Sequence, residues 1–233
     1  MTTFQERLIA VEERIAAACH RVNRVRSGVR LMAVSKTHPA SAICEAARAG
    51  LVLFGENRVQ EFDAKRAEVP GQVEVHLIGH LQSNKAAKAA AIFSAIDTVD
   101  SLRLLERLND AAKHSGRQLP VLLEIKMSDE KAKSGFSPAG VELQQALERA
   151  ADMEHVQVRG LMTVAQLDEN PEMARRCFRS LHILRDELGR MHPAIDLGEL
   201  SMGMSGDFEI AIEEGSTLVR IGTALFGARE VRV

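Results

Sequence analysis

The sequence contains neither tryptophan nor tyrosine, and it has only three cysteines. The absence of tyrosine removes that residue from the candidate catalytic acids and bases. Cys19, Cys44 and Cys177 lie far apart and form no C-x-x-C pair. Their spacing argues against a disulfide framework or a zinc ribbon, and it favours a reducing compartment. We therefore expect a cytoplasmic protein without a metal site.

Long apolar runs and a strong net charge are also missing. No run of about 18 apolar residues occurs, so we expect no transmembrane helix. The first residues are charged and lack the apolar region of a signal peptide. A net charge of -2 gives no general attraction to nucleic acid or to anionic membranes. Neither is expected as a partner.

Short runs rich in Val, Ile and Leu instead alternate along the chain with segments of helical period. The chain has 233 residues, of which 45% are hydrophobic and 27% charged, enough for a substantial core. The predicted strands are residues 30–36, 51–57, 73–79, 95–100, 120–127, 157–164, 196–203 and 217–223. Strands that alternate with helices predict parallel pairing and the α/β class.

Eight predicted strands favour a closed (β/α)8 barrel, a TIM barrel. Residues 3–23 read as an additional amphipathic helix, with Thr3 and Glu6 as a capping box. This helix could fill the eighth place in the outer ring, since only seven helical segments lie between eight strands. No linker-like stretch occurs, so we expect a single domain over residues 1–233. An open doubly wound sheet is the alternative, although no G-x-G-x-x-G follows the first strand.

Start and stop signals mark several of the helices. The predicted starts are at Pro39, Ser101, Ser137-Pro138 and Asn170-Pro171, and the predicted stops are at Gly50, Gly116 and Gly215.

In barrels of this kind, function is carried at the carboxyl ends of the strands. Lys36 ends the first predicted strand. A lysine held at an apolar barrel mouth could lose its proton and form a Schiff base with a carbonyl compound. The alternative is a surface lysine just past a strand end.

Small and hydroxyl-bearing residues end the last two predicted strands. Ser205 comes after the seventh, and Gly222 and Thr223 end the eighth. Such residues let backbone N–H groups approach an anion, and the following helix adds partial positive charge. This favours a phosphorylated ligand, while a helix N-cap is the alternative role for Ser205. A lysine beside a phosphate site points to pyridoxal phosphate (PLP), which needs an amine and a phosphate nest.

Seven segments in order carry a resemblance to a known family. They are Ala33–Thr37, Phe54–Glu61, His76–Lys85, Lys133–Gly135, Arg159–Met162, Leu200–Ser205 and Val219–Ala228. They closely resemble the pyridoxal phosphate homeostasis proteins, the YggS/PROSC family, along nearly the whole chain.

This resemblance implies a barrel similar to the N-terminal domain of alanine racemase. It implies PLP bound as a Schiff base on Lys36, with phosphate contacts at Ser205, Gly222 and Thr223. It also places Arg220 opposite the pyridine nitrogen and Asn57 near the ring. For Arg220 the residue pattern supports this placement. Side chains alternate along a strand, so Arg220 and Gly222 point to one face, toward the barrel mouth, and Val219 and Ile221 point to the other. An ion pair of Arg220 with Glu56 or Asp207 is the alternative.

The family is thought to hold PLP, to hand it to PLP-dependent apoenzymes, and to influence amino-acid and keto-acid pools. No turnover reaction is established for it, so we expect a cofactor-binding monomer rather than an enzyme. An amino-acid racemase is the alternative. Its second base would be a tyrosine from a further domain, and we expect no room for that domain after Thr223. A sugar-phosphate enzyme on a plain barrel is a third interpretation.

Two weaker features remain. His76 and His80 are four residues apart, but no H-E-x-x-H occurs and a metal site is disfavoured. Lys126 and the Lys133–Gly135 segment flank the fifth predicted strand, and the segment could form a lip over the ligand or an exposed loop. That choice stays open from the sequence.

Overall fold

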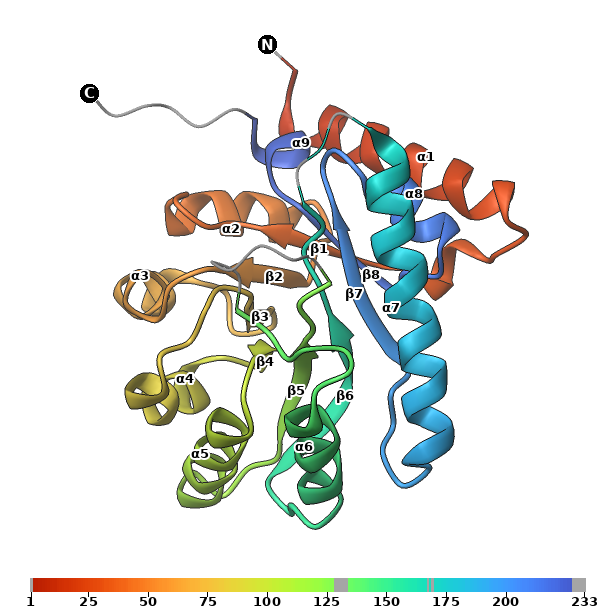
Figure 1. Ribbon diagram of the computed structural model, residues 1–233. Coiled ribbons are helices and arrows are strands. Elements are labelled where there is room, and N and C mark those ends of the chain that lie inside the picture. Colours follow the sequence, from red (N-terminus) through yellow and green to blue (C-terminus); the bar gives the residue numbers. More distant parts are fainter. Residues whose placement is uncertain (1, 128–133, 167, 169, 228–233) are drawn as a thin grey trace.

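The computed structural model describes residues 2–127, 134–166, 168 and 170–227. Among them, eight parallel strands form a closed barrel in sequence order (Figure 1). The strands are β1 (Arg30–Val34), β2 (Leu53–Glu56), β3 (Glu74–Leu77), β4 (Ala95–Val99), β5 (Leu119–Glu124), β6 (Val156–Met162), β7 (Glu199–Met204) and β8 (Leu218–Ile221). The predicted (β/α)8 barrel is therefore confirmed, and each predicted strand overlaps an observed one.

Helices surround the barrel and alternate with its strands (Figure 1). They are α1 (Phe4–Arg21), α2 (Ala40–Arg48), α3 (Val59–Lys65), α4 (Ala86–Ile92), α5 (Leu102–His114), α6 (Val141–Ala151), α7 (Pro171–Met191), α8 (Phe208–Glu213) and α9 (Thr223–Phe226). Short 3-10 turns lie at Arg26–Gly28, Arg66–Glu68 and Ser83–Lys85. No helix in the described part of the chain is long and apolar enough to cross a membrane.

The two faces of each strand have different neighbours. Leu31 and Ala33 of β1 belong to the large core cluster between the barrel and the helices. Met32, which lies between them, packs with Leu53 and Leu218 in a separate small cluster. Alternation along the strand thus separates an apolar outer layer from the barrel interior.

Charged side chains gather at the amino end of the barrel, where several stay partly exposed. Arg30 lies 2.9 Å from Glu74 and 3.6 Å from Glu199. Further along the axis, His76 Nδ1 lies 3.0 Å from Asp97 Oδ1. These pairs occupy the amino end of the barrel, so a ligand is to be sought at the carboxyl end, here called the mouth.

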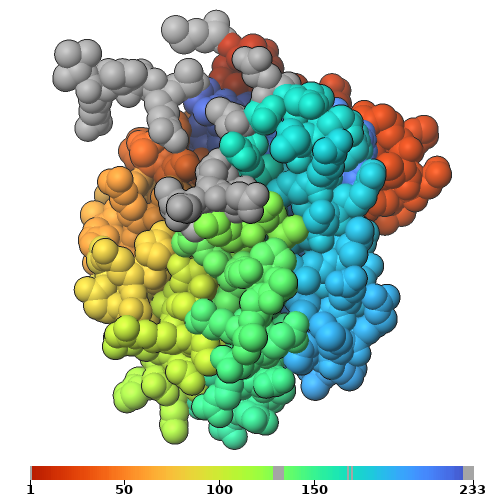
Figure 2. Space-filling model, in the orientation of Figure 1, coloured from red at the N-terminus to blue at the C-terminus, as the bar shows by residue number. Residues whose placement is uncertain are grey.

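Helix α1 takes the outer-ring place that follows the last strand. It packs against α8 and α9, which flank β8. Arg7 Nε donates to the carbonyl of Leu225, and the rings of Phe4 and Phe226 are 5.5 Å apart. In the space-filling view, part of α1 shows at one side of the molecule, beside α7 (Figure 2). The predicted helix and its Thr3–Glu6 capping box are confirmed.

Ion pairs through three glutamates link α1 to α7. Glu209 and Glu213 lie in α8, and Glu214 is its C-cap residue. Glu213 accepts hydrogen bonds from Arg21 of α1 and Arg175 of α7, both at 2.7 Å. Glu209 pairs with Arg14 and Arg21, and Glu214 pairs with Arg175 and Arg179. Burial raises the pKa of Glu213, but the two arginines outweigh it and leave that pKa below its usual value.

Most of the predicted helix boundaries hold. Asn170 caps α7 with Pro171 in its first turn, and Ser101 caps α5. The predicted stops have positive φ: +98° at Gly50, +61° at Gly116 and +101° at Gly215. Pro39 stands at the N-cap of α2, one residue before the helix.

The predicted helix start at Ser137-Pro138 is wrong, because α6 begins at Val141 after Gly140. The carbonyl of Ser137 instead accepts the Gly140 amide at 2.9 Å and closes a turn. The single-domain organisation of residues 1–233 stays a prediction.

Replacing Glu213 with alanine should lower the free energy of unfolding by about 1 kcal/mol at pH 7, because two helix-bridging ion pairs are lost. The folded-state pKa of Glu213 is lowered. The difference from wild type is therefore fully present above the ordinary glutamate pKa of about 4.3. It disappears as the pH falls through the lower folded-state value. Urea unfolding at several pH values measures this effect.

Glu187→Ala on the exposed face of α7 is the matched control and should leave stability within about 0.5 kcal/mol of wild type. An equal loss in both variants, or a difference that persists in acid, would contradict the bridging role.

Candidate functional site

Lys36 lies at the mouth, directly after β1. Ser35 is fully buried and points outward, where its hydroxyl donates to Glu56 Oε1 at 2.5 Å. Alternation along the chain therefore starts the Lys36 side chain on the inner side of the barrel. Lys36 is half-buried. It is the second residue of a four-residue turn, which the His38 amide closes by donating to the Ser35 carbonyl at 3.1 Å.

The loops after β7 and β8 meet at the same mouth. The Ala224 amide donates to Ser205 Oγ at 3.4 Å. Gly222 is the N-cap of the one-turn helix α9, and Thr223 is its first residue. The first N–H groups of a helix have no intrahelical acceptor. A hydroxyl, a glycine and a helix start thus converge in one place. The helix expected from the sequence to add positive charge is the one that follows Ser205, and the sequence did not predict α9.

The alternative role of Ser205 as a helix N-cap is wrong. The N-cap of α8 is Asp207, and Ser205 instead reaches the backbone of α9. Asp207 Oδ1 accepts the Met204 amide at 2.6 Å, which fixes the loop from the other side. Burial raises the pKa of Asp207, against the opposing effects of that amide and of Arg220.

Arg220 lies inside the barrel below these loops. It donates to Ser201 Oγ at 2.6 Å and to the Thr163 carbonyl at 2.8 Å. Val219 and Ile221 belong to the outer core cluster, so the period-two prediction is confirmed. Burial lowers the pKa of Arg220, yet arginine starts so high that it stays protonated.

The alternative ion pair of Arg220 with Glu56 is wrong. Glu56 points outward and contacts Ser35 and Lys65.

The backbone of Asn57 lies against Gly79, where there is no room for a side chain. A Cβ at Gly79 would lie 2.2 Å from the Asn57 carbonyl oxygen. The Gly79 carbonyl in turn accepts a hydrogen bond from Thr98 Oγ1 at 2.9 Å. The segments after β2 and β3 are thereby pressed together, and Asn57 is half-buried at the rim.

Glu124 at the end of β5 is a mouth residue that the sequence did not single out. Burial raises its pKa, and the neighbouring Asp100 raises it further. Ser134 Oγ donates to Glu124 Oε2 at 3.3 Å. The only sequence signal for Glu124 was its place two residues before Lys126, on the same face of the strand.

The segment after β5 folds back beside the strand end. Lys126 donates its backbone N–H to Phe136, and Phe136 donates to Glu124, at 2.9 and 2.8 Å. Ser134 and Gly135 therefore lie beside the mouth. Lys133 falls outside the described residues.

The two histidines contact different acids. His76 pairs with Asp97 inside the barrel, and this carboxylate outweighs burial and raises the pKa of His76. His80 is exposed and lies 3.1 Å from Asp100. Together with Arg103, His80 and Asp100 help to line a surface hollow of about 450 Å³ beside the mouth.

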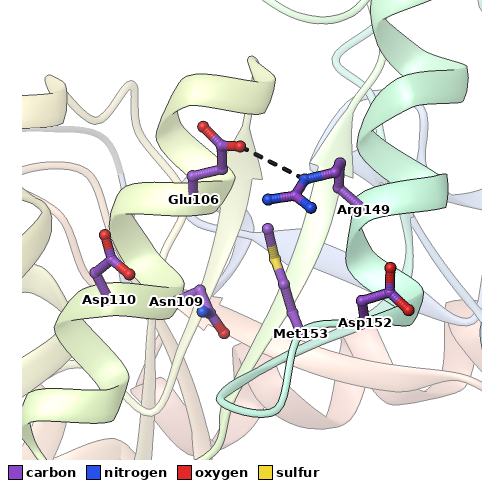
Figure 3. Close-up of a pocket in the computed structure, with 6 residues that line it drawn as sticks. All are labelled: Glu106, Asn109, Asp110, Arg149, Asp152 and Met153. Atoms are coloured by element: carbon purple, nitrogen blue, oxygen red, sulfur yellow. Dashed lines mark ion pairs between the residues drawn. The ribbon is translucent and has the colours of Figure 1, made fainter.

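A second hollow of about 340 Å³ lies away from the mouth, between α5 and α6 (Figure 3). Glu106 and Arg149 face each other across it, 3.7 Å apart, with Asn109 and Met153 below. Its lining comes from α5, from α6 and from the two residues after the end of α6. It therefore belongs to the helical layer and not to the barrel mouth.

The donor set at the mouth suits an aldehyde that carries a phosphate. Lys36 offers an amine in the turn after β1. Arg220 offers a fixed positive charge on β8, and the Ser205–Ala224 contact marks a place where small residues and hydroxyls surround a helix start. Because β8 pairs with both β1 and β7, these groups share one side of the mouth.

A family model described as "Alanine racemase, N-terminal domain" matches residues 8–230. The chain therefore belongs to this family of barrels. Solved alanine racemases agree in fold: the Clostridium difficile 630 enzyme has a TM-score of 0.71 at 17% identity, with 94% of this chain and 56% of that chain covered.

Within that class, the chain belongs to the pyridoxal phosphate homeostasis proteins. The Aquifex aeolicus protein of that name is 42% identical, over 97% of this chain and 98% of its own. The Escherichia coli K12 protein is 41% identical, over 99% and 98%. PipY of Synechococcus elongatus PCC7942, solved with PLP bound, has a TM-score of 0.82 at 42% identity, covering 93% and 100%.

Replacing Gly79 with alanine should force the Asn57 backbone to move, because the new methyl group would overlap its carbonyl oxygen. We expect a loss of about 1–3 kcal/mol in the free energy of unfolding, measured in urea. Gly71→Ala, where a Cβ would meet no neighbour, is the control and should be nearly neutral. Equal stability of the two variants would show that the close approach does not constrain the site.

Proposed function

We propose that this protein binds pyridoxal phosphate in the cytoplasm as a Schiff base on Lys36. Ser205, Gly222 and Thr223 would hold the phosphate. Arg220 would face the pyridine nitrogen, and Asn57 would lie near the ring. The Ser205–Ala224 contact supports this proposal most directly, because it brings a hydroxyl to the first turn of α9, beside the strand that carries Arg220. The PLP-bound structure of the PipY relative supports the choice of ligand.

We propose further that the protein holds PLP and hands it to PLP-dependent apoenzymes, and so influences amino-acid and keto-acid pools. The buried arginine supports holding over turnover. Arginine does not give up its proton at ordinary pH, so a ring nitrogen bonded to it stays unprotonated. An unprotonated ring is a poor electron sink for carbanion chemistry. The names of the relatives also describe homeostasis and not a reaction.

The racemase alternative has less support. Racemisation needs a base on each side of the substrate carbon, and this sequence has no tyrosine to act beside a lysine. The similarity to solved alanine racemases, at 17% identity, extends to the fold alone.

Loading the purified protein with PLP should give a visible absorption band, and borohydride should then fix the cofactor to the peptide that contains Lys36. Lys36→Ala should lack both the band and the label, because no other amine ends β1. Lys126→Ala, which removes a second mouth lysine, should keep them. Peptide mass mapping reads the outcome, and a label found chiefly on Lys126 or Lys85 would refute the assignment.

Removing the hydroxyls of Ser205 and Thr223 together should weaken PLP binding at least tenfold, with little change in the stability of the cofactor-free protein. Hydrogen bonds to a charged group contribute about 1.5–3 kcal/mol each. Equilibrium dialysis with PLP gives the affinity, and urea unfolding gives the stability. The control replaces two exposed serines away from the mouth, Ser27 before β1 and Ser180 on α7, with alanine. Unchanged PLP affinity in the Ser205–Thr223 variant would rule out the proposed phosphate contacts.

A further inference from the structure

Lys65, in the last turn of α3, is a buried lysine with 9% relative exposure. Lysine is rarely buried unless it is paired, because its ammonium loses hydration. Its Nζ lies 2.8 Å from Glu56 Oε1 and 3.4 Å from Glu61 Oε1. Glu56 itself is fully buried, and desolvation raises its pKa despite the contacts with Lys65 and Ser35.

The same ammonium also binds both ends of the turn that carries Lys36. Lys65 Nζ donates to the His38 carbonyl at 2.8 Å and to the Ser35 carbonyl at 3.3 Å. Ser35 and His38 are the first and fourth residues of that turn. One buried cation therefore spans the backbone on each side of Lys36.

The turn needs such support because of its third residue. Thr37 has a φ of +68°, a conformation that is unusual for any residue except glycine and especially for a β-branched one. Turns with positive φ at this position normally carry glycine or asparagine there. Strained backbone of this sort persists only where its surroundings over-determine it. Here the Thr37 amide donates to Glu61, which itself contacts Lys65.

We propose that Lys65, with Glu56 and Glu61, is a positioning residue for Lys36. The three side chains hold the Ser35–His38 turn in its strained form and so keep the Lys36 amine at the mouth. The cofactor part of this inference rests on the function proposed above. A preorganised amine loses less freedom when it forms a covalent bond to an aldehyde, so the effect should appear in PLP affinity.

The test combines Lys65→Met with Glu56→Gln, so that no unpaired charge stays buried. The matched control is Asp63→Asn with Lys88→Met. These two substitutions remove the 2.9 Å ion pair between Lys88 of α4 and Asp63 of α3. Its side chains are more exposed than those of Lys65 and Glu56. In cofactor-free protein, hydrogen–deuterium exchange of the His38 amide should become at least tenfold faster in the Lys65–Glu56 variant, relative to the core amide of Leu105. It should not change in the control.

The second readout compares PLP with pyridoxamine 5'-phosphate, which offers the same phosphate but has no aldehyde for Lys36. The Lys65–Glu56 variant should bind PLP at least tenfold more weakly and pyridoxamine 5'-phosphate as wild type does. An equal loss for both ligands would mean a general structural role and would overturn the proposal, as would unchanged exchange at His38.

Two further outcomes need separate readings, namely a double variant that does not fold and a failure of the proposed function. If the double variant does not fold, Glu61→Ala serves instead, since this side chain is 27% exposed and its loss removes the acceptor of the Thr37 amide. Unchanged exchange at Thr37 and His38 in that variant would overturn the proposal. If exchange rises as expected but borohydride fixes no PLP to Lys36 in the wild-type protein, the proposed function is wrong. In that case the role of Lys65 in holding the Ser35–His38 turn is still supported.

Discussion

The site depends on the pairing of the first strand with the last. Arg30 to Ala33 of β1 lie in register with Leu218 to Ile221 of β8. This contact closes the sheet and brings the turn after β1 beside the turn after β8. Without it, Lys36 and the Gly222–Thr223 turn would lie at opposite edges of an open sheet. The chemistry proposed for the mouth is thus a consequence of closure.

The two ends of the barrel carry different polar contacts. At the amino end, Arg30 pairs with two glutamates, and all three side chains are partly exposed. At the carboxyl end, Arg220 is bonded to a hydroxyl and a carbonyl. It keeps its charge without a carboxylate at hydrogen-bonding distance among the described residues, a suitable state for meeting an acceptor on a ligand. The helical layer is joined separately, through the glutamates in and just after α8.

Much of this arrangement could be predicted from local pattern. Each strand is a short apolar run, and the positions of Lys36, Ser205 and Gly222 at strand ends came directly from those runs. The start of α6 was missed because Ser137-Pro138 has the chemistry of a helix start but forms a turn three residues earlier. Glu124 and Lys65 were missed for a different reason. Their contacts come from segments distant in sequence, so the residue pattern of a single segment does not predict these contacts. The Lys65 contacts depend on the angle between α3 and the end of β1, which only the assembled barrel defines.

The place of α1 in the ring has a consequence for synthesis of the chain. This helix is made before all eight strands, yet its partners Glu209 and Glu213 are made only after β7. The same holds for β1, which pairs with β8. A nascent chain emerging from the ribosome therefore carries an open strand edge and an undocked amphipathic helix until α8 and β8 have emerged. Contacts of such large sequence separation fold slowly, and open edges invite pairing with other chains. For this barrel, the interval before the last strand emerges is the period of greatest exposure to misassembly.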